Sequence, residues 1–237
     1  QTVFLNCYFN SSNTNSLFEE LVSNEKTDFS RYNYFYASFA AASKKIDKAK
    51  DIVNTALKSY PRNLLLNQYK LDLNQGNYIS SFNCNNKGHV IAEILYITSN
   101  ALSSQSIYSL SNFYLNLAKY LNEEFHSYDT LLAENFYKID SFEAAKKIYD
   151  NLGKKGKAFK WHASKQLAKI YIQDENKDKA LELVSKAYNN LANKDIYETF
   201  DYAEFLKNNE KFEESILYYT KVINEVKKNH ILYAEST

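Results

Sequence analysis

The stretch that decides the fold runs from Gln166 to Ala187 and reads QLAKIYIQDENKDKALELVSKA. Apolar and small residues recur every three or four positions on both sides of the polar segment DENKD, which is typical of two amphipathic helices joined by a short turn. The residues expected on the buried faces are Leu167, Ala168, Tyr171, Ala180, Val184 and Ala187. Ala168 and Ala180 stand where the two helices would cross, and small side chains there let antiparallel helices approach closely.

The same spacing returns at four other places in the chain. The matching sets are Tyr36, Ala37 and Ala40 with Ala49, Val53 and Ala56; Ser99 and Leu102 with Ser111, Leu115 and Ala118; Leu132, Ala133 and Phe136 with Ala145, Tyr149 and Leu152; and Tyr202, Ala203 and Leu206 with Ser215, Tyr219 and Val222. Repeats then start near residues 30, 92, 126, 161 and 196, and the last three steps are 34, 35 and 35 residues. A constant period of this length predicts stacked helical hairpins.

Residues that break helices are scarce in this sequence. Pro61 is the single proline, and there are four glycines among 237 residues. Because β-sandwiches, barrels and doubly wound α/β folds need many turns that contain Gly or Pro, none of these classes fits. Apolar residues make up 45% and charged residues 24% of the chain, which excludes a disordered or collagen-like protein. The composition therefore predicts an all-α fold of helices joined by short polar turns.

The pattern of small, large and aromatic positions resembles the tetratricopeptide repeat, as found in uncharacterised bacterial proteins of that superfamily. The resemblance covers residues 30–61 and 90–228, and it implies an α-solenoid, a right-handed superhelix of stacked antiparallel hairpins. We expect one solenoid over residues 1–237. Within it, residues 1–89 should hold atypical hairpins with one clearer repeat at 30–61, residues 90–228 four repeats, and residues 229–237 a tail or the start of a further helix.

Two parts of the N-terminal region depart from the repeat. Residues 1–28 should form a degenerate hairpin, with its turn at 10–16 and its second helix at 17–23. Residues 64–89 should begin with a helix that ends near Gly76, followed by a short or degenerate second helix and a loop around 83–88. The turns of the clearer repeats, at 141–143, 175–178 and 208–214, are polar and acidic, and the Asp and Asn residues of the last two are suited to capping the next helix.

In the tetratricopeptide family, the first helix of each hairpin commonly lines a concave groove that holds a peptide or a partner helix. The resemblance places the following candidates on this groove: Glu134, Tyr137, His162, Lys165, Lys169, Tyr197 and Glu204. His162, Lys165 and Lys169 have the i, i+3, i+7 spacing of one helical stripe. Such a groove suits a peptide with an acidic group near its middle, and the alternative is a solvated helix face with ordinary lysines. The carboxylate clamp of chaperone-binding members is incomplete, because Ile97, Leu131 and Asp201 stand where its other polar or basic members are needed.

No pattern in the chain points to catalysis, a cofactor or a metal. The four histidines are scattered, and Cys7 and Cys84 suit neither a disulfide framework nor a metal motif. The segment Gly153–Gly156 lies between two repeats and should be a turn that ends a helix. A net charge of +1 gives no large field to attract nucleic acid or an anionic membrane, and no apolar stretch approaches 18 residues.

These features favour a non-catalytic scaffold or adaptor that binds a protein or peptide partner and is not an enzyme. Two alternatives stay open: a helical-repeat protein that binds single-stranded RNA, and the repeat region of a larger enzyme. Self-association through an exposed end of the solenoid is a further option. The sequence contains no methionine, as expected of an internal or processed fragment. It leaves open whether the compartment is the cytoplasm or the periplasm.

Overall fold

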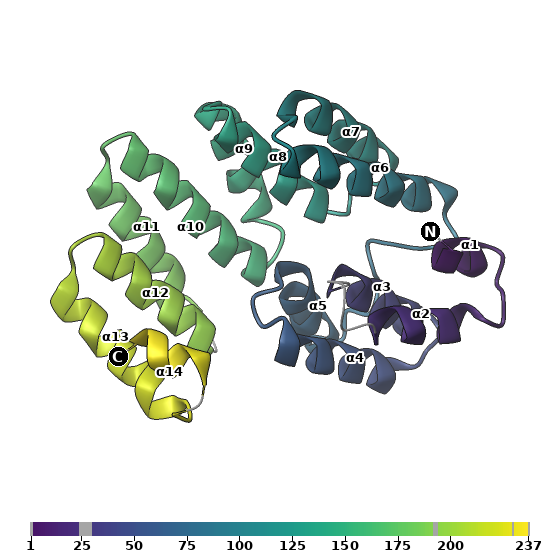
Figure 1. Ribbon diagram of the computed structural model, residues 1–237, viewed down its shortest axis with the longest axis horizontal. Helices are drawn as coiled ribbons and strands as arrows, with labels where there is room; N and C mark the ends of the chain where they lie inside the picture. Colours follow the sequence, from purple (N-terminus) through teal and green to yellow (C-terminus); the bar gives the residue numbers. More distant parts are fainter. Residues whose placement is uncertain (1, 24–29, 192–193, 229, 237) are drawn as a thin grey trace. The chain divides into compact units, whose positions relative to one another are not determined.

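The computed structural model describes residues 2–23, 30–191, 194–228 and 230–236. Within these ranges the chain forms fourteen helices and no strand, which confirms the all-α expectation (Figure 1). Two compact units are present, Gln1–Ala158 (unit 1) and Phe159–Thr237 (unit 2).

Most helices are joined in antiparallel pairs by short turns, as the ribbons of Figure 1 show. Unit 1 contains α1 (Thr2–Tyr8), α2 (Thr14–Val22), α3 (Ser30–Ala42), α4 (Ile46–Ser59), α5 (Leu64–Asn74), α6 (Lys87–Ser104), α7 (Tyr108–Leu121), α8 (Ser127–Lys138) and α9 (Phe142–Leu152). Unit 2 contains nearly all of α10 (Lys157–Gln173), then α11 (Lys177–Asn189), α12 (Ile196–Asn208), α13 (Phe212–Glu225) and α14 (Ile231–Ser236).

The helix crossings lie where the repeat pattern places them. Each of the five hairpins has a buried pair of small residues separated by twelve positions, and every member is at most 2% exposed. The pairs are Ala37 and Ala49, Ser99 and Ser111, Ala133 and Ala145, Ala168 and Ala180, and Ala203 and Ser215. Where the second residue is serine, its hydroxyl donates a hydrogen bond to the carbonyl oxygen of the first, at 2.8 Å from Ser111 and 2.9 Å from Ser215. Small side chains at these points keep the paired helices close.

The turns of the five hairpins also share one conformation. Each contains one non-glycine residue in the left-handed region, with φ between 57° and 64°, seven positions after the small residue of the first helix. These residues are Lys44, Ser106, Asp140, Glu175 and Glu210. In each turn the following backbone N–H donates to the carbonyl five residues earlier, as from Asn176 to Tyr171 at 2.8 Å. In this Schellman geometry, backbone N–H groups of the turn donate hydrogen bonds to carbonyl groups at the end of the first helix.

Side-chain capping was expected in these turns and is found in only part of them. Asn176 accepts a hydrogen bond from the backbone N–H of Lys179 at 3.3 Å. At the start of α9 and α13, however, Ser141 and Lys211 make no side-chain cap bond. The capping expectation is therefore correct for α11 and wrong for α13, where the residue before the helix is Lys211, whose side chain has no hydrogen-bond acceptor.

The N-terminal region departs from the repeat as expected, but it differs from the prediction at two places. The hairpin of α1 and α2 is present, but its turn is shorter than expected, so α2 begins at Thr14 instead of residue 17. Residues 24–28 of the expected hairpin lie outside the described residues. Helix α5 ends at Asn74, beside Gly76 with φ of 80°, as expected. The second helix expected after it is absent, and residues 75–86 form one irregular segment that leads directly to α6.

A disulfide joins this segment to the N-terminal helix. Cys7 of α1 and Cys84 are separated by 77 residues in sequence, and their Cα atoms lie 5.8 Å apart. This bond was not expected from the sequence, because only the folded path of the chain brings the two cysteines together. The phenyl rings of Phe4, Phe35 and Phe82 pack beside it with centroids 4.4 to 5.3 Å apart. The segment therefore belongs to the core of unit 1 despite its irregular backbone.

One buried ion pair connects α3 to α6 and α8. Arg31 donates from two nitrogens to the two carboxylate oxygens of Glu93, at 2.6 and 2.7 Å, and from a third to the hydroxyl of Ser127 at 2.5 Å. The guanidinium carbon also lies 3.7 Å from the ring centre of Tyr96. Glu93 is fully buried. The acidic residue within the apolar segment of α6 is thus matched by a bidentate partner, the arrangement that buried charge requires.

Candidate functional site

Helices α10 and α12 are the first helices of the two hairpins in unit 2, and a salt bridge shows that one face of each lies beside the other. Lys165 Nζ of α10 is 2.5 Å from Asp201 Oδ2 of α12. The same ammonium group lies 5.1 Å from the ring centre of Trp161, which is buried in the core of unit 2. We call this surface the α10–α12 face, formed by His162, Lys165, Lys169, Tyr197, Glu198, Asp201 and Glu204.

His162 lies half-buried one turn from Lys165 and two turns from Lys169. Burial lowers the pKa of His162 to about 4, and the positive charges of the two lysines contribute in the same direction. Its imidazole is consequently neutral at pH 7. On this helix the predicted stripe therefore presents two cations and one neutral ring.

The two predicted residues of α12 make contacts within unit 2. The hydroxyl of Tyr197 lies 3.4 Å from Nε2 of His230, which precedes α14. Glu204 accepts hydrogen bonds from the ammonium of Lys207 and the hydroxyl of Tyr219. Burial alone would raise the pKa of Glu204, but these two hydrogen bonds lower it, so that the group is a carboxylate at neutral pH.

Glu198 also lies on this face, although the repeat pattern did not predict it. Its backbone and side chain form a capping box with Asp195 at the start of α12, which includes a hydrogen bond of 2.7 Å to Asp195 Oδ1. Burial raises the pKa of Glu198 to about 7, and the charges of Asp195 and Asp201 add to this effect. The pattern Asp195-Ile-Tyr-Glu198 is a recognisable capping signal. Its position beside Lys165 and Asp201, however, depends on the packing of α10 against α12.

The remaining predicted residues belong to unit 1. Glu134 is exposed on α8, and Tyr137 is half-buried with its ring 5.6 Å from that of Phe142. The five candidates on α10 and α12 thus lie on two adjacent helices. Their continuation through Glu134 and Tyr137 stays a prediction.

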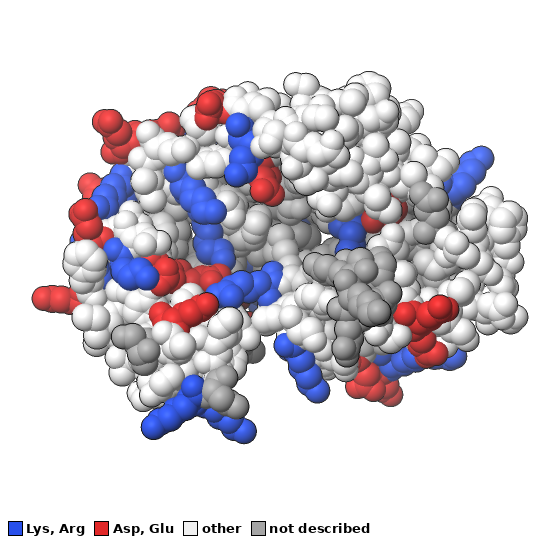
Figure 2. Space-filling model, in the orientation of Figure 1, with Lys and Arg blue, Asp and Glu red and all other residues white. Residues whose placement is uncertain are grey.

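The α10–α12 face carries charges of both signs. Figure 2 shows lysine side chains along α10 and acidic side chains gathered over the neighbouring α12. Asp201 neutralises Lys165, while Glu198 and Glu204 add acidic groups. The α10–α12 face is therefore not uniformly basic, unlike surfaces that bind phosphate backbones. The arrangement suits a partner that itself offers both charged and hydrogen-bonding groups.

The structure also bears on the glycine-containing turn, on metal binding and on membrane spans. The Gly153–Gly156 segment is the turn between α9 and α10, as expected, and a Cβ at Gly156 would lie 2.2 Å from the side chain of Gln68. Among the described residues, no group of three or more His, Cys, Asp or Glu side chains could hold a metal ion. None of the described helices is both long enough and apolar enough to cross a membrane.

No protein-family model matches the sequence, and no curated protein matches it. Among solved structures, the chain is similar to a tetratricopeptide repeat protein from Parabacteroides merdae, at 10% identity over 99% of this chain and 97% of that one, with a TM-score of 0.46. It is also similar to pilF of Pseudomonas aeruginosa, at 13% identity over 87% of this chain and 95% of that one, with a TM-score of 0.37.

The class of the protein follows from its own hairpins. Five buried pairs of small residues twelve positions apart, and five equivalent left-handed turns, give the chain a tetratricopeptide-like all-α repeat fold.

Proposed function

We propose that this chain is a non-catalytic scaffold or adaptor that binds a protein or peptide partner along the α10–α12 face. The observation that carries the proposal is the salt bridge between Lys165 and Asp201, which brings the outer stripes of two successive first helices together. Helical repeats bind extended peptides and helices on surfaces of this kind. In this proposal Glu134 and Tyr137 of α8, in unit 1, are further contacts of the same partner.

The charges on this face favour a protein partner over RNA. Asp201 pairs with Lys165, and Glu204 is a carboxylate on the same face as Lys169, so this face has no net positive charge to hold a phosphate backbone. A peptide can offer groups of both signs to such a face. Because Lys165 is already paired with Asp201, a partner has to compete with that ion pair or contact both of its members. We therefore expect recognition of a peptide with both charge signs, a narrower class than the acidic peptide suggested by the lysine stripe alone.

Site-specific photo-crosslinking tests the proposal. A photoreactive phenylalanine analogue replaces Lys169 on the proposed face, Tyr137 at the further proposed contact in unit 1, or Lys186 on α11 as a matched control, since Lys169 and Lys186 are both exposed. Lysate with and without nuclease treatment is the source of partners, and captured proteins are identified by mass spectrometry. We expect the same protein from positions 169 and 137 and its absence from position 186.

A charge exchange supplies the second readout. The double variant Lys165→Asp with Asp201→Lys keeps an ion pair but reverses its direction, so the fold should persist while the charge pattern changes. We expect capture from position 169 to fall about tenfold in this variant, which corresponds to about 1.4 kcal/mol of binding free energy. Equal capture from positions 169 and 186, or loss of all capture with nuclease, would contradict the proposed face.

A further inference from the structure

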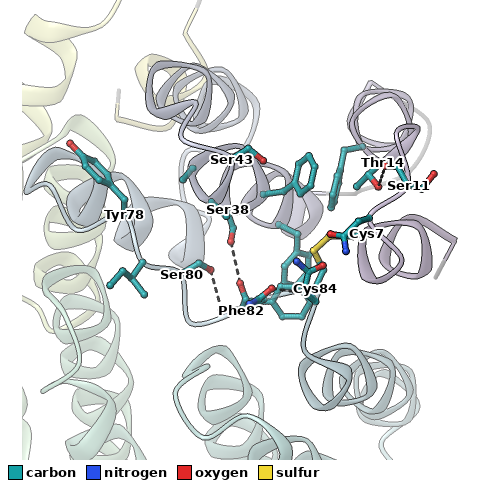
Figure 3. Close-up of a pocket in the computed structure, with 18 residues that line it drawn as sticks. Cys7, Ser11, Thr14, Ser38, Ser43, Tyr78, Ser80, Phe82 and Cys84 are labelled. Carbon is teal, nitrogen blue, oxygen red and sulfur yellow. Dashed lines mark hydrogen bonds between the residues drawn. A yellow bond between two sulfur atoms is a disulfide. The ribbon is translucent and has the colours of Figure 1, made fainter.

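Unit 1 contains a pocket that is separate from the α10–α12 face. Its volume is about 630 Å³, within the usual range for small-molecule sites. Three parts of the chain form its walls: the end of α1 with the turn and start of α2, the C-terminal half of α3, and the irregular segment 78–85. Figure 3 shows Tyr78 on one side of the pocket and the Cys7–Cys84 disulfide on the other, with Ser38 and Phe82 between them.

The lining combines small polar side chains with aromatic rings. The hydroxyl and amide groups come from Asn10, Ser11, Thr14, Ser38, Ser43, Ser80, Asn83 and Asn85, and the rings from Phe18, Phe35, Phe39, Tyr78 and Phe82. Of the described residues that line the pocket, none is Asp, Glu, Lys, Arg or His. This contrasts with the α10–α12 face, where most of the predicted residues are ionisable.

The chemistry of the lining limits the ligands that fit it. A phosphate, carboxylate or ammonium group would lose its hydration without meeting an opposite charge, and this desolvation is costly. Some of these groups, such as Thr14 and Ser38, are already hydrogen-bonded within the chain. A wholly apolar ligand would nevertheless strip water from the exposed polar side chains of Asn10, Ser43 and Asn85 without replacing its hydrogen bonds. The ligand that matches both parts of the lining is uncharged, carries several hydroxyl groups, and has C–H surfaces that pack against aromatic rings.

We propose that this pocket is a binding site for a neutral saccharide of about one to three sugar units, a size consistent with pockets of this class. Sugar hydroxyls both donate and accept hydrogen bonds, as do the serine, threonine and asparagine side chains of the walls. The C–H faces of the sugar ring supply the apolar surface that Tyr78 and Phe39 can cover.

The walls of the pocket are held in place before any ligand arrives. The disulfide fixes the segment 78–85 to α1. The hydroxyl of Ser38 donates to the carbonyl oxygen of Phe82 at 3.3 Å, and the hydroxyls of Tyr34 and Ser80 are hydrogen-bonded at 2.8 Å. A pocket built from otherwise irregular backbone would lose much of its affinity if its walls had to be ordered on binding. The disulfide therefore acts as a positioning element for this site.

Titration calorimetry with the purified oxidised chain tests the proposal. The probes are glucose, galactose, mannose and N-acetylglucosamine, the disaccharides maltose, lactose and cellobiose, and three charged counterparts, glucuronate, glucosamine and glucose 6-phosphate. A second arm uses soluble starch and galactomannan, which separates a free small sugar from a unit of a longer glycan. We expect one or more neutral sugars to bind with 1:1 stoichiometry and the charged counterparts of that sugar to bind at least about tenfold more weakly.

Two variants locate the binding. Ala42 is exposed and lines the pocket, so Ala42→Trp should fill the cavity and weaken sugar binding at least about tenfold. Ala101 on α6 is equally exposed and lies outside the lining, and Ala101→Trp is the matched control that should bind normally. Tyr78→Ala, a substitution at an exposed position, provides a second loss-of-binding variant if Ala42→Trp does not fold. Circular dichroism checks the helix content of each variant.

The proposal is overturned if no neutral sugar binds up to about 20 mM, a limit that detects even very weak sites. It is also overturned if charged counterparts bind as tightly as neutral sugars, or if Ala42→Trp and Tyr78→Ala both bind like the control. Reduction of the disulfide should weaken binding, and unchanged affinity in the reduced chain would remove its positioning role. Crosslinking from position 169 is measured on Ala42→Trp in parallel, so that failure of the saccharide site and failure of the partner-binding face are told apart.

Discussion

The protonation of His162, on the α10–α12 face, should affect the stability of unit 2. Its pKa is about 4 in the folded chain, against a usual value of 6.5, because it is buried and lies near Lys165 and Lys169. Between these two values the unfolded chain binds a proton that the folded chain does not. The stability of unit 2 therefore falls as the pH decreases from 6.5 to 4, and it is unaffected by this group above pH 6.5.

Replacing the histidine should remove this dependence. We expect His162→Gln to lose less stability than the parent chain between pH 7 and pH 4, with a difference of up to about 3 kcal/mol. Urea unfolding followed by the fluorescence of Trp161, the only tryptophan, measures the free energy of unfolding of unit 2. Identical pH profiles of the two proteins would mean that His162 is protonated as easily in the fold as in water.

Glu198 serves as the internal control, because it acts in the opposite direction. Burial raises its pKa to about 7 from 4.5. Here the folded chain binds the extra proton, so Glu198 makes the protein more stable as the pH falls from 7 to 4.5. Glu198→Gln should flatten this part of the profile while it leaves the contribution of His162 intact. Measuring both variants separates two effects that partly cancel in the parent chain.

At the scale of the helical hairpin, the buried small residues determine how closely two helices pack. Ala180 is fully buried against the helix that contains Ala168. We expect Ala180→Asp to bury an unpaired charge at this crossing and to cost roughly 3 to 5 kcal/mol of unfolding free energy. Ala180→Ser is the matched control, because Ser111 and Ser215 occupy the equivalent positions of other hairpins and donate to the carbonyl opposite.

Thermal unfolding followed by circular dichroism gives the comparison. The serine variant should remain within about 1 kcal/mol of the parent, since it gains one hydrogen bond and little volume. The aspartate variant should lose helix content in unit 2. Equal melting curves for the aspartate variant and the parent would show that residue 180 does not lie at a crossing and that the assigned register is wrong.

The turn between α10 and α11 offers a second test at this scale. Glu175 is held at φ of 59°, a conformation that costs a non-glycine residue free energy. We expect Glu175→Gly to stabilise unit 2 by roughly 0.5 to 1 kcal/mol, as the relief of strain exceeds the entropy that glycine adds to the unfolded chain. The control is Gln173→Gly, at the last residue of α10, which should be destabilising. A destabilised Glu175→Gly chain would contradict the turn conformation.

The hairpins were largely predictable from the sequence, whereas their ends and the segment 75–86 were not. Small residues twelve positions apart leave a periodic signal, so the crossings at Ala168 and Ala180 could be placed correctly. Left-handed turns filled by Lys44 or Glu175 leave no such signal, because glycine, the usual marker, is absent. Likewise, the salt bridge of Lys165 with Asp201 and the disulfide of Cys7 with Cys84 join residues 36 and 77 positions apart. Such contacts depend on tertiary packing that local patterns do not encode.

At the scale of the whole molecule, the chain consists of two units with separate sets of core residues. The core of unit 1 includes the aromatic cluster around Phe35 and the pair of Arg31 with Glu93. Trp161, Tyr188 and Tyr202 belong to a core cluster of unit 2. Since the disulfide lies entirely within unit 1, its effect on stability should be confined to that unit.

Breaking the disulfide tests this division. Cross-linking residues 77 positions apart lowers the entropy of the unfolded chain, and on the chain-entropy view this is worth about 4 to 5 kcal/mol. We expect Cys7→Ser with Cys84→Ser, or reduction by dithiothreitol, to move the unfolding of unit 1 to clearly lower urea concentration in circular dichroism. The transition seen by Trp161 fluorescence should keep its midpoint, because that residue reports unit 2. A parallel shift of both signals would instead show that the two units unfold as one cooperative body, with the bond in unit 1 stabilising the whole chain.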